Sequence, residues 1–316
     1  MQIIDAAKVG AVLDYPALVD ALRALFREGC TVPLRHHHGV EVPGKAEATL
    51  LLMPAWTPGG YIGIKMVTVF PSNGQQGLPA IMGQYLLLSG DTGQVLAMID
   101  GQTLTARRTA AASALAASYL ARPDAERLLM VGTGALAPQL IRAHCAVRPS
   151  IRDIAIWGRN AAKAEALAER MAAETGLAVT AARDIETAAR QADIISCGTL
   201  SKQPLVLGAW LKPGAHLDLV GAFTPEMRES DDEAARRARV FVDTREGALK
   251  EAGDIVLAVK AGALTSDAIQ GDLYDLSRGI SKGRESAEEI TLFKSVGTAL
   301  EDLAAAQLAF ERAQAI

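Results

Sequence analysis

The sequence has few cysteines, no concentration of charge of one sign and no long hydrophobic run. Its three cysteines, Cys30, Cys145 and Cys197, are an odd number at wide spacing, which argues against a disulfide framework and against a metal site built on paired cysteines. The 32 Lys and Arg residues nearly balance the 36 Asp and Glu residues, with no block of like charge, so we expect no nucleic-acid or membrane partner. The first residues lack the basic and apolar regions of a secretion signal, and no apolar run is long enough to span a bilayer. We therefore expect a cytoplasmic protein.

Two kinds of secondary-structure pattern follow one another along the chain. Apolar segments between residues 48 and 96, punctuated by turn residues, predict a largely antiparallel sheet, and Asp14 is placed to cap a helix over residues 15–28. From residue 126 to about residue 294, strands and helices alternate, which predicts a doubly wound parallel α/β sheet of the Rossmann type.

The length of 316 residues and the hydrophobic content of 50% are enough for about two domains. An amphipathic helix closes the chain and can return to the first domain. We therefore expect an α+β domain of residues 1–122 plus 298–316, into which a parallel-sheet domain of residues 123–297 is inserted.

A glycine turn is the most informative local motif. The apolar run over residues 128–131 breaks at Gly132, continues through Gly134, Leu136 and Ala137, and resumes with helical spacing. Gly132 permits a tight turn, Gly134 lets the backbone approach a pyrophosphate, and Ala137 allows close packing of helix on strand. The pattern predicts a dinucleotide site, the alternative being a glycine-rich turn without a ligand.

The end of the next strand bears on the choice of dinucleotide. This strand ends in Trp157-Gly158-Arg159 without an acidic residue. An acidic residue here would hold a free ribose 2′-hydroxyl, whereas an arginine can meet a 2′-phosphate. Arg159 therefore favours NADP(H), with NAD(H) possible, the alternative being an ordinary exposed arginine.

Two basic side chains stand where a cation is costly. Lys65 lies in the middle of an apolar strand, where an ammonium group must find an anion or a cavity, or else lie on an edge strand at the surface. Arg107 and Arg108 lie near the start of a helix of small residues, where the helix dipole disfavours cations. We expect one of this pair to face a carboxylate or a phosphate.

Several other reactive residues are expected to be structural. His36, His37 and His38 are adjacent on a strand and point to alternate faces, with no further ligand at suitable spacing, so we expect no metal. Cys197 lacks the His and Asn partners of a nucleophile, and His216 stands on an apolar strand. Both are interpreted as core residues.

Five ordered motifs together resemble the ornithine cyclodeaminase and mu-crystallin family over nearly the whole chain. They begin at Gly63, Leu104, Gly132, Gly221 and Phe293. The resemblance implies a homodimer whose first segment and last helix form a substrate-binding and dimerisation domain around the dinucleotide-binding domain.

The resemblance also implies roles for individual residues. The family binds the substrate carboxylate with residues that match Arg35, Lys65 and Arg108, of which Lys65 and Arg108 are the expected catalytic residues. Cofactor contacts would come from Thr109, Gly132, Gly134, Leu136, Ala137, Arg159, Thr199, Val220 and Val296.

Two departures from the cyclodeaminase pattern favour a different reaction. Phe223 stands where the cyclodeaminases carry an aspartate that handles the amino group, and Leu51 stands where they carry a glutamate for the distal amine. An apolar wall suits a carbon ring, so the resemblance implies NAD(P)H-dependent reduction of a cyclic ketimine acid, either Δ1-pyrroline-2-carboxylate to proline or its six-membered analogue. The alternatives are an ornithine cyclodeaminase or amino-acid dehydrogenase, and a non-catalytic NADPH-binding protein. Lys65, a water and an already protonated substrate all remain open as the proton source.

Overall fold

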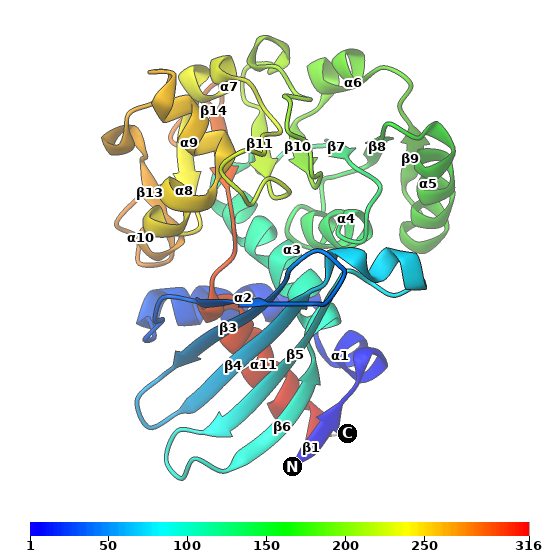
Figure 1. The fold of residues 1–316 in the computed structure, drawn as a ribbon. Coiled ribbons are helices and arrows are strands. Elements are labelled where there is room, and N and C mark those ends of the chain that lie inside the picture. The colour runs from blue at the N-terminus through cyan, green and yellow to red at the C-terminus, as the bar shows by residue number, and fades with distance from the viewer. Residues whose placement is uncertain (316) are drawn as a thin grey trace. The chain divides into compact units, whose positions relative to one another are not determined.

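The computed structural model describes residues 1–315, with the backbone alone for Gln75. Two compact units make up the chain: residues 1–108 with 298–316, and residues 109–297 (Figure 1). The division falls inside helix α3 (Gly101–Leu120), whereas the boundary that the sequence suggests, at residue 122, follows the end of that helix. Residue 316, the last of the expected first domain, lies outside the described residues.

A six-stranded sheet forms the first unit, with strand order β1-β6-β5-β4-β3-β2. All neighbouring strands are antiparallel except the parallel pair β1 and β6, as the turn-punctuated strands predict. The strands are β1 (Gln2–Ile4), β2 (His36–Val40), β3 (Ala48–Trp56), β4 (Tyr61–Val69), β5 (Ile81–Ser89) and β6 (Val95–Asp100).

Helix α11 (Ala299–Ala313) runs across one face of this sheet, against β3, β4 and β5 (Figure 1). Helix α2 (Tyr15–Glu28) packs on α11 and begins as predicted, with the Asp14 carboxylate accepting a hydrogen bond from the Ala17 amide at 3.0 Å. The unit is completed by α1 (Ala6–Val12), the 3₁₀ helix η1 (Pro71–Gln76) and the start of α3.

An eight-stranded, wholly parallel sheet forms the second unit, in the order β13-β12-β14-β11-β10-β7-β8-β9. From β7 the chain moves outward through β8 and β9, and then returns to place β10 and β11 on the other side of β7. This reversal between β7 and β10 is the topological switch point at which such sheets bind ligands. The strands are β7 (Arg127–Val131), β8 (Asp153–Trp157), β9 (Ala178–Ala181), β10 (Ile194–Cys197), β11 (His216–Leu219), β12 (Ala238–Val242), β13 (Gly271–Asp272) and β14 (Ile290–Lys294).

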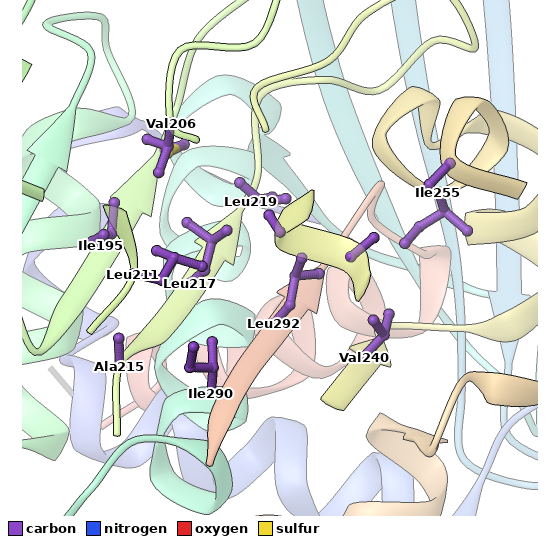
Figure 2. Packing of buried hydrophobic residues seen from close by; sticks show 14 of the residues in the cluster. Ile195, Val206, Leu211, Ala215, Leu217, Leu219, Val240, Ile255, Ile290 and Leu292 are labelled. Atoms are coloured by element: carbon purple, nitrogen blue, oxygen red, sulfur yellow. The ribbon is translucent and has the colours of Figure 1, made fainter. Parts of the chain in front are cut away.

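Apolar side chains of β10, β11, β14 and β12 build a continuous core in this unit, with Ile255 contributed by a helix (Figure 2). These strands are buried on both faces, which is the ordinary state of a parallel sheet and explains their nearly continuous hydrophobic sequence. The helices are α4 (Ala137–Val147), α5 (Ala161–Thr175), α6 (Ile185–Gln191), α7 (Asp232–Arg237), α8 (Arg245–Glu251), α9 (Gly253–Lys260) and α10 (Leu273–Ser277), with the 3₁₀ turns η2 (Gly208–Trp210) and η3 (Ser266–Ala268). Across residues 1–315, no helix combines the length and apolar character needed to cross a membrane.

Candidate active site

The glycine turn joins β7 to α4 as the sequence predicts. Gly132 has φ +120°, and a Cβ there would fall 2.8 Å from the Gly198 carbonyl oxygen, so only glycine fits this turn. A Cβ on Gly134 would meet no atom within 4 Å, so its backbone borders open space. Helix α4 begins at Ala137 after Leu136, which gives no side-chain cap. The amide groups of the turn and of the first helical residues are therefore suited to a phosphate.

Parallel register brings three further strand ends to the same edge of the sheet as the glycine turn. Cys197 pairs with both Val131 and Leu219, and Leu219 pairs with Lys294. The residues that follow these strand ends include the predicted cofactor contacts Thr199, Val220 and Val296. Thr109 lies half-buried on α3, and its place in a dinucleotide site stays a prediction.

Arg159 is exposed two residues beyond the end of β8. The following Asn160 caps α5, its side chain accepting a hydrogen bond from the Lys163 amide at 3.1 Å. A Cβ on Gly158 would lie 2.7 Å from Thr133 Cγ2, so the loop that carries Arg159 packs tightly on the glycine turn. This position suits a group attached to the ribose next to the turn.

Lys65 lies in the first unit on β4, an interior strand flanked by β3 and β5. The edge-strand alternative is therefore wrong. The side chain is buried, and its Nζ lies 2.7 Å from Asp302 Oδ2. Burial, together with the charge of Arg108, lowers the pKa of Lys65 from 10.5 to about 8, although Asp302 opposes this shift.

Arg108 is the member of the arginine pair that meets carboxylates. Its Nε lies 2.8 Å from Asp302 Oδ1, and its Nη1 lies 2.5 Å from Glu301 Oε2. Burial acts to lower the pKa of Arg108, but the two carboxylates outweigh burial and raise the pKa above its ordinary value. Arg107 instead donates to the Leu13 carbonyl. The expected anion is thus supplied by the protein itself.

Lys65, Arg108, Glu301 and Asp302 form the charged cluster, in which two cations face two carboxylates below the surface. Glu301 and Asp302 were missed in the sequence as functional candidates. Acidic residues in the first turn of a helix are usually accounted for by the helix dipole, and both residues follow the N-cap Thr298 of α11. The unpartnered Lys65 and Arg108 were the signal that two acids should be sought elsewhere in the chain.

Tyr85 pairs with Lys65 across β4 and β5 and is fully buried. A Cβ on Gly63 would lie 1.8 Å from the Tyr85 hydroxyl oxygen, so glycine at this position makes room for the ring. Burial and the nearby Asp302 charge hold the pKa of Tyr85 well above its ordinary value. Tyr85 therefore stays neutral beside the charged cluster.

Leu51 shares a sheet face with Lys65. Lys65 pairs with Met53, and Leu51 lies two residues from Met53 on β3, so the side chains of Leu51 and Lys65 project to the same side. Arg35 is half-buried just before the edge strand β2. Phe223, in the second unit, follows β11 and is 44% exposed. The substrate-binding roles of these three residues stay predictions.

His216 and Cys197 are both fully buried. His216 Nδ1 lies 2.9 Å from Thr291 Oγ1, and burial lowers the pKa of the imidazole to about 3, which keeps it neutral. Burial raises the pKa of the Cys197 thiol well above its ordinary value. Both residues are core residues, as the sequence suggests. Among residues 1–315 no group of three or more His, Cys, Asp and Glu side chains is arranged to hold a metal ion.

Comparisons with known proteins identify the family. The model of the ornithine cyclodeaminase/mu-crystallin family matches residues 3–316. The Δ1-pyrroline-2-carboxylate reductase of Paracoccus denitrificans is 43% identical over 285 residues, which cover 90% of this chain and 89% of the relative.

Two solved structures are similar over the whole chain. One is Thermococcus litoralis Δ1-pyrroline-2-carboxylate reductase in complex with NADH and L-proline, with 33% identity, a TM-score of 0.92 and coverage of 100% of this chain and 98% of that one. The other is an archaeal alanine dehydrogenase dimer with bound NAD, with 29% identity, a TM-score of 0.90 and coverage of 100% and 96%.

Proposed function

Because the chain belongs to the ornithine cyclodeaminase/mu-crystallin family, we propose that it is an oxidoreductase that reduces a cyclic ketimine acid with NAD(P)H. Δ1-Pyrroline-2-carboxylate, which gives proline, is the first substrate to test, followed by its six-membered analogue. The names of the Paracoccus and Thermococcus relatives support this choice.

The observation that carries the proposal is the pairing inside the charged cluster. Asp302 is in contact with Lys65 and Arg108, and Glu301 is in contact with Arg108. Both carboxylates are thus engaged by the protein's own cations, and Leu51 presents an apolar side chain on the same sheet face. An ammonium group of a diamino acid would find no free carboxylate in this cluster, and burying it unpaired would cost several kcal/mol. A ring without a distal charge fits this environment better.

In this proposal the first unit binds the substrate. Lys65 and Arg108 have more N–H donors than their contacts with Asp302 and Glu301 use. The remaining donors, with Arg35, hold the substrate carboxylate and orient the C=N bond. Reduction of the imine adds a hydride to carbon and a proton to nitrogen. Lys65 supplies the proton, because its lowered pKa of about 8 makes its ammonium group a stronger acid than an ordinary lysine.

The second unit holds the dinucleotide, which supplies the hydride when bound. The glycine turn and the first amides of α4 receive the pyrophosphate, and the strand-end residues Thr199, Val220 and Val296 border the remainder of the molecule. NADP(H) is the favoured form, supported by exposed Arg159 and the absence of an acidic residue at the end of β8; NAD(H), which the two structural relatives bind, is the second candidate.

A homodimer is part of the proposal. The sheet face opposite α11 carries alternate apolar residues of β1, β4 and β5, among them Ile3 (64% exposed), Met66 (41%) and Met82 (39%). Exposed apolar patches of this kind are usually covered by a partner, and the similar alanine dehydrogenase is a dimer. A Met66→Glu variant should then be monomeric by light scattering, whereas Leu249→Glu, at a 40% exposed site in the second unit, should remain dimeric.

Since NAD(P)H is drawn from a diffusible pool, we place the enzyme in the cytoplasm.

A substrate screen tests the function. Oxidation of NADPH and NADH is followed with five- and six-membered cyclic imine acids, and the amino-acid product is identified by mass spectrometry. Oxidation that depends on the imine supports the proposal. Formation of proline and ammonia from ornithine without added reductant would instead establish a cyclodeaminase. NAD-dependent oxidation of alanine would indicate an amino-acid dehydrogenase, and tight NADPH binding without turnover of any imine would indicate a non-catalytic binding protein.

A further inference from the structure

Glu229 is a fully buried carboxylate that joins two strand-end loops of the second unit. Its Oε1 accepts hydrogen bonds from the Thr199 amide at 2.6 Å and from the Thr199 hydroxyl at 2.8 Å. Its Oε2 accepts from the Gly221 amide at 2.7 Å and the Ala222 amide at 3.3 Å. Thr199 follows β10 and Gly221 follows β11, so one side chain ties together the loops at the carboxyl ends of two adjacent strands.

The backbone at Glu229 is held in place by the buried Asp254 carboxylate. The Asp254 Oδ1 atom accepts hydrogen bonds from the amides of Glu229 and Ser230 at 2.8 and 2.9 Å. Asp254 Oδ2 lies 3.2 Å from the buried Nζ of Lys294, which ends β14. Asp254 thus fixes the backbone at Glu229 and is itself paired with Lys294. Lys294 ends β14, and the loop after β14 contains Val296.

The Thr199 and Gly221 loops pack so closely that no side chain fits between them at Gly221. A Cβ on Gly221 would lie 1.9 Å from the Thr199 carbonyl oxygen and 2.2 Å from the Thr199 nitrogen. If the Glu229 acceptors were lost, the buried amide of Gly221 and the part-buried amide of Thr199 would be left without them, and buried donors without acceptors are costly. The loops would have to move apart to find new partners.

We propose that Glu229 is a positioning residue that shapes the nicotinamide half of the dinucleotide site by holding the Thr199 and Gly221 loops together. The inference rests on the proposed dinucleotide function. A doubly wound sheet consists of two mononucleotide-binding halves. The half with the glycine turn and Arg159 receives the adenosine, so the half with β10, β11 and β14 receives the nicotinamide nucleotide. Glu229 lies in this second half.

Fragment binding separates this role from a general effect on folding. The Glu229→Gln variant places amide hydrogens where an acceptor is needed, so its Kd for NADPH should rise at least tenfold. Its Kd for 2′-phospho-ADP-ribose, which lacks the nicotinamide, should stay within twofold of wild type. Glu233→Gln, at a half-exposed site on α7 where Glu233 pairs with Arg236, is the matched control and should change neither constant. Equal weakening of both ligands, or no weakening of either, would overturn the proposal.

Failure of this test is distinguishable from failure of the proposed function, because wild-type protein that binds neither NADPH nor the fragment would refute the dinucleotide site itself.

If Glu229→Gln does not fold, the pH dependence of binding to the wild-type protein provides the test. Burial and the charge of Asp254, opposed by Lys294, raise the pKa of Glu229 to about 7; the Cys197 thiol also faces this group but stays neutral. Protonation should therefore raise the ratio of the NADPH Kd to the fragment Kd at least threefold between pH 8 and pH 6. A ratio that stays constant from pH 8 down to the lowest pH at which the protein remains folded would overturn the proposal.

Discussion

Lys65 Nζ lies 2.7 Å from Asp302 Oδ2, both groups being almost fully buried. Asp302 uses its other oxygen for Arg108, at 2.8 Å. Asp302 therefore contacts both cations that are proposed to hold the substrate, and it raises the pKa of the lysine against the effect of burial.

An Asp302→Asn variant is expected to lose at least tenfold in kcat for imine reduction. Without this carboxylate the pKa of Lys65 falls further, so the loss of activity on the alkaline side should begin at lower pH than in the wild type. The pH dependence of kcat measures this shift, with Asp20→Asn, which alters an exposed ion pair with Arg23, as the control. Breaking a buried pair costs about 3 to 5 kcal/mol, so unfolding in urea should be recorded for each variant. An alkaline limb at the wild-type pH would refute the coupling between Asp302 and Lys65.

Activity of the wild-type enzyme in the reductive direction is expected to decline as the pH rises through about 8. The proton on Lys65, with a pKa of about 8, is lost over this range, and the proposed acid disappears with it. A Lys65→Met variant should retain little activity at any pH and show no such decline. A flat wild-type profile between pH 7 and 9.5 would assign the proton to water or to the substrate.

The lowered pKa of Lys65 also makes the free energy of unfolding depend on pH. Between pH 8 and 10.5 the unfolded chain retains a proton on Lys65 that the folded chain has released, so raising the pH through this range favours the folded state. Between pH 8 and pH 10 the wild type should gain about 2 kcal/mol relative to Lys65→Met, at 1.36 kcal/mol for each pKa unit. Urea unfolding of both proteins at pH 8 and pH 10 measures the gain, and equal changes in the two proteins would contradict it.

Replacing Arg159 by Glu is expected to move the preference toward NADH. The exposed guanidinium is proposed to meet the 2′-phosphate of NADPH, and a carboxylate at this position would repel that phosphate and accept a hydrogen bond from a free 2′-hydroxyl. The ratio of kcat/KM for NADPH to that for NADH should fall at least tenfold. Arg152→Glu, at a side chain that is 75% exposed at the other end of β8, is the control. A ratio unchanged from the wild type would refute the assigned role.

The two glycines of the turn are expected to respond differently to alanine. Gly132→Ala should destabilise the fold by about 1 to 3 kcal/mol, because its φ of +120° disfavours a side chain and the added Cβ would meet the Gly198 carbonyl. Gly134→Ala should leave the melting temperature within a few degrees of wild type, since open space surrounds the added methyl group, yet weaken dinucleotide binding at least tenfold. Thermal unfolding and fluorescence titration with NADPH test the pair. Normal binding by a stable Gly134→Ala protein would remove the turn from the proposed site.

The sequence predicts those parts of the molecule that depend on neighbours along the chain. The parallel sheet, the Asp14-capped helix and the glycine turn all follow from short patterns, and all are present. The need of Lys65 for an anion also follows from its own strand, but the identity of that anion does not, because Asp302 comes from the far end of the chain. The choice between Arg107 and Arg108 likewise depends on which side of α3 faces α11.

Buried polar contacts in the second unit likewise do not follow from short sequence patterns. Glu229 is separated from Thr199 by a loop, by η2 and by β11, and nothing in its neighbourhood in the sequence indicates that its carboxylate faces four donors. Such contacts arise only when the register of the parallel strands brings their ends together.

Helix α11, which supplies Glu301 and Asp302, leaves the ribosome after β3, β4 and β5, the strands on which it packs. Until it docks, the growing polypeptide holds Lys65 and Arg108 without their counter-charges, and the first sheet lacks the helix that covers one of its faces. A chain that stops before residue 298 should therefore lack substrate turnover. Adding a synthetic peptide of residues 298–315 should restore that turnover.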